Sequence, residues 1–107
     1  MLSPLIRTSL LEFRAALERQ FGARLRLVRL FGSWARGQAN EASDVDVAVV
    51  IDELSPADWK KAYSLAGDVE LSTALPLSPL VLSSDRYQQM ILSGGIAREI
   101  ARDGIAP

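Results

Sequence analysis

The stretch LFGSWARGQANEASDVDVAVVID, residues 30–52, decides the fold of this chain. It predicts the end of one strand, a turn of small residues, a polar segment, and a second strand that opens on two aspartates. Side chains on a strand alternate between its two faces, so Asp44 and Asp46 point the same way. The alternate residues from Val45 to Ile51 point the other way, toward a core. The stretch therefore predicts two carboxylates on one face of a strand whose other face is buried.

Two chemical features meet in this stretch. Asp44 and Asp46 are expected roughly 6.5–7 Å apart at the backbone, near enough for their oxygens to share one or two divalent ions. Gly32 allows a ligand to approach the backbone closely and Ser33 adds a hydroxyl, a combination that suits phosphate groups. Phosphates beside a metal pair indicate phosphoryl or nucleotidyl transfer. Each half alone has a plainer explanation, because Asp-x-Asp often starts a solvated strand and Gly-Ser is usually only a turn.

Length and composition exclude several other chemistries. At 107 residues we expect one domain, residues 1–107. The sequence has no 18-residue apolar run and no signal-peptide layout, so we expect a cytoplasmic protein with no membrane partner. The chain has no cysteine and no histidine, which removes disulfides, thiolate zinc sites and Ser-His-Asp triads. Any metal must then be held by oxygen ligands, which favours Mg²⁺ or Mn²⁺. A net charge of −1 argues against nucleic acid as the main partner, although a local basic patch is compatible with it.

The segment before the signature predicts a helix and a strand. Ser3 followed by proline starts the helix and Gly22 ends it. Its apolar residues recur every three or four positions as a core stripe of Leu2, Ile6, Leu10, Phe13, Leu17 and Phe21. Residues 23–31 predict a strand with Leu25 and Leu27 on one face. The arginines Arg24, Arg26 and Arg29 either touch nucleic acid or a partner, or are solvated near a sheet edge; the second is the plainer interpretation.

The segment after the signature predicts a strand at 44–51, a helix from Ser55 to about Thr73, an edge strand at 78–82, and two short final helices, the first capped by Ser84. Trp59 and Tyr63 are interpreted as core. With a short helix after the first strand, the predicted fold class is α/β (α+β): a small mixed β-sheet with helices packed on one face.

The Gly-Ser turn and the Asp-x-Asp pair together are a much more specific signal than either motif alone. Gly32-Ser33-x-Ala35-Arg36-Gly37 followed by Ser43-Asp44-x-Asp46 resembles the signature of the DNA polymerase beta-like nucleotidyltransferase superfamily. Within it the chain is similar to the minimal nucleotidyltransferases, small proteins paired with a HEPN-type partner. The resemblance implies that Asp44 and Asp46 hold Mg²⁺ and are catalytic, and that Gly32 and Ser33 grip the β- and γ-phosphates of a nucleoside triphosphate. Arg36 either adds charge to that triphosphate or forms a surface salt bridge, and Ser43 either assists binding or only orients the turn.

The resemblance also implies a function and exposes one departure. It implies transfer of AMP from ATP to a hydroxyl of a partner protein, as the antitoxin of a HEPN toxin–antitoxin pair, with the acceptor site completed by that partner or by a second copy of the chain. The superfamily usually supplies a third carboxylate from a later strand. Here the corresponding strand contains no acid, and Ser78 or Pro79 stands where one is expected. The alternative is a catalytically weak or inactive module that binds nucleotide and neutralises its partner by contact.

Overall fold

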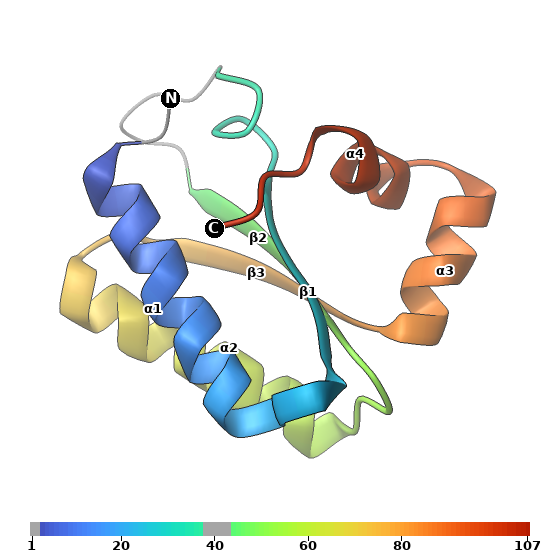
Figure 1. The fold of residues 1–107 in the computed structure, drawn as a ribbon, viewed down its shortest axis with the longest axis horizontal. Helices are drawn as coiled ribbons and strands as arrows, with labels where there is room; N and C mark the ends of the chain where they lie inside the picture. The colour runs from blue at the N-terminus through green and yellow to red at the C-terminus, as the bar shows by residue number, and fades with distance from the viewer. Residues whose placement is uncertain (1–2, 38–43) are drawn as a thin grey trace.

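The computed structural model describes residues 3–37 and 44–107. Within these described residues the chain forms three strands and four α-helices, with one short 3-10 turn (Figure 1). Their bounds, in chain order, are α1 Pro4–Phe21, η1 Gly22–Arg24, β1 Leu25–Phe31, β2 Val45–Ile51, α2 Pro56–Thr73, β3 Leu77–Ser83, α3 Ser84–Ser93 and α4 Ile96–Asp103. The short helix expected after the first strand is a run of turns over residues 32–37 instead. None of the described helices is long and apolar enough to cross a membrane.

The three strands form one mixed sheet in the order β1-β2-β3. β1 runs antiparallel to β2, whereas β3 runs parallel to it. The register places Asp46 of β2 opposite Phe31 of β1 and opposite Ser78 of β3. β2 is thus the central strand, and its first residues lie where β1 ends and β3 begins. The fold class expected from the sequence, a small mixed sheet with helices, is confirmed.

The helices cover both faces of this sheet, which corrects the expectation that they pack on one. The first face bears the alternate β2 residues from Val45 to Ile51, at most 1 % exposed, and it packs with apolar residues of α1 and α2. The opposite face bears Ala48 and Val50 and packs with Tyr87 of α3 and Ile100 of α4. Figure 1 shows the two helix pairs on either side of the strands. β2 is apolar on both faces over most of its length, which demands cover on both.

The two long helices begin with local signals that the sequence shows. The Ser3 hydroxyl accepts a hydrogen bond from the Ile6 amide, and Gly22 ends α1 with φ +57°. Ser55 and Asp58 form a reciprocal capping box at the start of α2. Every described residue of the predicted apolar stripe in α1 is buried, namely Ile6, Leu10, Phe13, Leu17 and Phe21. The cap predicted at Ser84 is shifted by one residue, because Ser83 caps α3 instead.

Two side-chain placements differ from expectation. The register between β1 and β2 shifts between Leu25 and Leu27, so Arg26 is an extra residue in the ladder. This bulge resets the alternation, and Leu25 packs with the α1 face whereas Leu27 packs with the α4 face. Trp59 and Tyr63 are 44 % and 37 % exposed, so they are surface residues rather than core.

Candidate active site

The candidate site lies where β1 ends, the 32–37 turn follows, and β2 begins. Asp44 precedes β2 and is exposed, and Asp46 is its second residue and half-buried. The turn is closed by a hydrogen bond of 3.2 Å from the Arg36 amide to the Gly32 carbonyl. The fold therefore brings together Gly32, Asp44 and Asp46 as the sequence predicted. Ser43 lies outside the described residues.

Gly32 packs its backbone directly against the Asp46 carboxylate. A Cβ added to Gly32 would lie 2.4 Å from Oδ2 of Asp46, a collision with a half-buried side chain. Gly32 also has φ +73°, a conformation that residues with a Cβ rarely adopt. Both facts explain why this position holds glycine, and they fix the turn against the carboxylate.

The surroundings of Asp46 disfavour the ionised form of its carboxylate. Burial raises the pKa of Asp46, the neighbouring charge of Asp44 raises it further, and Arg36 lowers it. A carboxylate whose ionised form is disfavoured by burial and by a neighbouring acid is a place where a divalent cation would be held favourably. The pair is thus close enough to interact, as the alternation on the strand required.

Arg36 connects the turn to the last helix. Its guanidinium forms an ion pair with the carboxylate of Glu99 on α4, 63 residues further along the chain. Glu99 was not singled out in the sequence, where nothing but its helical spacing distinguishes it. The contact exists because α4 packs against β1 and so approaches the turn that follows this strand.

The third carboxylate is missing from the place where the resemblance would put it. Ser78 stands next to Asp46 on the parallel neighbour β3, and it is exposed. Paired residues on adjacent strands share a face, so an acid at this position would point toward the aspartates. Among the described residues, no three acids gather closely enough to hold a metal ion.

The donor set nevertheless fits Mg²⁺. This ion commonly takes one or two protein carboxylates and completes its shell with water and substrate phosphates. Asp44 and Asp46 supply two carboxylates, and the absence of a Cβ at Gly32 leaves room for the Asp46 carboxylate beside the turn. The residues present are consistent with a metal held jointly by the protein and a bound triphosphate.

Comparisons with known proteins identify the family. A family model described as a nucleotidyltransferase domain matches residues 10–92. The chain therefore belongs to the nucleotidyltransferase domain family, and it is a transferase. The resemblance found in the signature is confirmed.

Individual relatives narrow the class. The protein adenylyltransferase MntA of Thermococcus cleftensis is 33 % identical over 98 residues, which are 92 % of this chain and 88 % of the relative. A protein of Methanocaldococcus jannaschii is 30 % identical over 80 residues, 75 % of this chain and 76 % of the relative. A crystal structure of a toxin–antitoxin with AMP-PNP shares the fold, with a TM-score of 0.52 at 21 % identity over 87 % of this chain and 68 % of that chain.

Proposed function

We propose that this chain is a Mg²⁺-dependent protein adenylyltransferase that moves AMP from ATP to a hydroxyl of a partner protein, as the antitoxin of a HEPN toxin–antitoxin pair. The observation that carries the proposal is the packing of the Gly32 turn against Asp46, with Asp44 beside it. The name of the MntA relative and the bound AMP-PNP in the related toxin–antitoxin structure support the choice of adenylyl transfer to a protein.

Each residue has a task in the proposed reaction. Asp44 and Asp46 would hold the metal, which when bound would neutralise charge on the phosphates. Gly32 lets the turn approach the triphosphate, and Ser33 offers its amide and hydroxyl to phosphate oxygens. Arg36 adds positive charge near the same phosphates. The oxygen of the partner's hydroxyl bonds to the α-phosphorus while its proton passes to solvent water, the bond from the α-phosphorus to the bridging oxygen breaks, and pyrophosphate leaves.

One observation favours a second candidate function. Ser78, which cannot serve as a carboxylate ligand or base, occupies the β3 position beside Asp46. A protein that lacks this acid could still bind metal and nucleotide through its two aspartates. The second candidate is therefore a module that binds nucleotide and neutralises its partner by contact, without efficient transfer.

The test is incubation of the purified chain with Mg²⁺, labelled ATP and the protein encoded by the adjacent gene. We expect label on the partner, and loss of it by a factor of about 10²–10³ in Asp44→Asn/Asp46→Asn, since preorganised charge at a reacting group contributes on this order. Asp68→Asn is the matched control, because Asp68 is an exposed aspartate on α2. We expect this variant to retain full transfer.

Two outcomes would separate the candidates. No label, with ATP binding and complex formation intact, would favour the contact module and point to the acid missing at Ser78. Label that persists in Asp44→Asn/Asp46→Asn would contradict the assigned roles of both aspartates. A Mg²⁺-independent signal would contradict the metal assignment.

A further inference from the structure

The outer edge of β1 forms a basic groove apart from the aspartate pair. The groove has a volume of about 450 Å³ and is lined by Arg14, Glu18, Gly22 and residues 25–29. It contains three arginines and one acid, although the whole chain carries a net charge of −1. Because β1 is the first strand in the sheet order, no strand of residues 3–37 or 44–107 lies beside its outer side along the groove. We propose that this groove binds an extended acidic peptide segment of a partner protein, which adds to the sheet as a strand beside β1.

Near its C-terminal end, the main chain of β1 already pairs with a residue from outside the named strands, Ile105. Leu30 donates to the Ile105 carbonyl at 2.8 Å and accepts from the Ile105 amide at 2.9 Å, on the side away from β2. Main-chain groups two residues apart on a strand face the same way, so those of Val28 also face outward. The pairing is an isolated bridge, and it leaves Val28 as the next position for a strand to dock.

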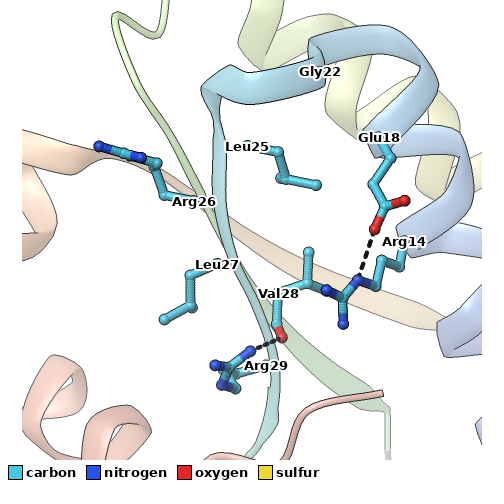
Figure 2. A pocket seen from close by; sticks show the side chains of 8 residues that line it. All are labelled: Arg14, Glu18, Gly22, Leu25, Arg26, Leu27, Val28 and Arg29. Atoms are coloured by element: carbon cyan, nitrogen blue, oxygen red, sulfur yellow. Dashed lines mark hydrogen bonds and ion pairs between the residues drawn. The ribbon is translucent and has the colours of Figure 1, made fainter.

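The outward carbonyl of Val28 is covered by a side chain rather than by a strand. The Arg29 guanidinium donates to this carbonyl at 2.8 Å (Figure 2). An incoming strand would offer a main-chain N–H to the same carbonyl, and Arg29 would then be released to meet a carboxylate. Strand addition of this kind takes affinity from main-chain hydrogen bonds and specificity from side-chain contacts.

The arginines lie on both sides of the strand edge. Figure 2 shows Arg14 on the α1 side of β1 and Arg26 on the other side. Arg14 pairs with Glu18 while 42 % exposed, and Arg26 pairs with Asp52 while 62 % exposed. Successive side chains of an added strand would point to alternate sides. Two adjacent acids on that strand would therefore meet basic side chains on both sides.

These charges also select among occupants. A second copy of the chain, paired edge to edge, would bring two sets of three arginines together and be disfavoured. Nucleic acid would use the charges but not the outward main-chain groups of Val28. The bulge at Arg26 limits regular pairing to a few residues around Val28, so charge must supply much of the specificity. An acidic peptide strand uses both features of the groove.

The test uses the full ¹⁵N-labelled chain and a capped heptapeptide of threonine and valine with two adjacent central glutamates. We expect saturable amide shifts at residues 27–29 and slower hydrogen exchange of the Val28 amide, by about tenfold or more at saturation. Two control peptides are matched: one carries lysines in place of the glutamates, and one has its central amides N-methylated. We expect both to bind at least about tenfold more weakly.

Matched variants locate the charge dependence. Arg14→Gln and Arg26→Gln should each weaken the acidic peptide several-fold, whereas Arg86→Gln, an exposed arginine on α3, should not. Absence of shifts at residues 27–29, or equal binding of the lysine peptide, would overturn the proposal. So would Val28 protection that rises with protein concentration alone, which would indicate a second copy. Shifts produced by oligouridine without slower Val28 exchange, in the absence of peptide binding, would indicate nucleic acid and overturn it too. None of these readouts requires ATP or Mg²⁺, so the outcome is independent of adenylyl transfer.

Discussion

Asp46 and Asp58 both lie near an arginine, but the pKa of Asp46 is raised and the pKa of Asp58 is lowered. The Arg24 guanidinium donates to both carboxylate oxygens of Asp58, at 3.0 and 3.3 Å, and with the Ser55 amide it lowers the pKa of Asp58 to about 2. Burial and Asp44 raise the pKa of Asp46, and Arg36 lowers it by less than they raise it.

The difference teaches how to separate a structural acid from a candidate catalytic one. Asp58 is satisfied within the chain, since it caps α2 and ties that helix to η1. The surroundings of Asp46 disfavour its ionised form, and the described residues do not fully offset this effect. A bound cation would relieve it, and such an effect is typical of functional sites. Four predictions test this contrast.

The largest effect should come from the backbone beside Asp46. Gly32→Ala would place a Cβ 2.4 Å from Oδ2 of Asp46, so we expect adenylyl transfer to fall by about 10²-fold, as for a misplacement of about 1 Å in other active sites. Gly37→Ala is the matched control, because Gly37 has a similar φ of +70° but no atom within 4 Å of an added Cβ. Steady-state transfer rates check both variants. Equal losses would attribute the effect to backbone strain and contradict the role given to the contact.

The next effect concerns the missing acid. Ser78→Asp would add a carboxylate on the β3 position paired with Asp46, so we expect transfer to rise by about tenfold with Mg²⁺ present. Without metal the same change should lower stability, because it crowds a third negative charge near two others. Transfer rates and thermal melting with and without EDTA measure the two effects. A rate that stays at or below the wild-type value would show that the site does not lack an acid there.

A smaller effect should follow from breaking the cap around Asp58. Ser55→Ala removes the hydroxyl that accepts from the Asp58 amide at 3.0 Å. We expect a loss of about 1 kcal/mol in the free energy of unfolding, or roughly 4 °C in melting temperature. Transfer activity at temperatures well below the melting point should be unchanged. A large activity loss in the folded variant would contradict the purely structural role.

The smallest effects are opposite pH dependences. The pKa of Asp58 is depressed, so its ionised form adds stability above pH about 4, and this contribution is lost as the pH falls toward 2. The pKa of Asp46 is raised, so its contribution is full at low pH and is lost as the pH rises through the folded-state value. At pH 7 without metal, Asp46→Asn should therefore be slightly more stable than wild type and Asp58→Asn less stable.

Urea unfolding in EDTA at a series of pH values checks both signs. Each difference from wild type should shrink on acidification, that of Asp46→Asn first and that of Asp58→Asn only toward pH 2. Curves that shift in the same direction for both variants would contradict the contrast between these residues.

The parts of this structure that follow from local signals could be predicted from the sequence. The caps at Ser3 and Ser55 and the apolar residues of β2 depend on spacing within a few residues. The meeting of Gly32 with Asp46 follows from the strand–turn–strand order of residues 30–52. The bulge at Arg26 could not be predicted, because it depends on how β1 and β2 pair rather than on the residues of β1 alone. The roles assigned to the site residues stay predictions until transfer is measured.

Long-range packing accounts for the remaining differences. The final helices cover the second face of the sheet, a placement that their own amphipathic patterns do not specify. Glu99 reaches Arg36 only through that placement. Trp59 and Tyr63 show the same limit, because helical spacing suggested core. Their tilted rings instead lie against each other at the surface, with centroids 4.3 Å apart, and the Tyr63 hydroxyl donates to the Pro79 carbonyl.

The ion pair between Arg36 and Glu99 also sets an order of events during synthesis of the chain. Its two residues are separated by 63 positions, and ribosomes add about 5–20 residues per second. Glu99 is therefore made roughly 3–13 s after Arg36, when both aspartates and all three strands have already been translated. The ion pair of Arg36 with Glu99 can form only once α4 docks. The contact that ties the 32–37 turn to α4 thus forms after Asp44 and Asp46 have been translated.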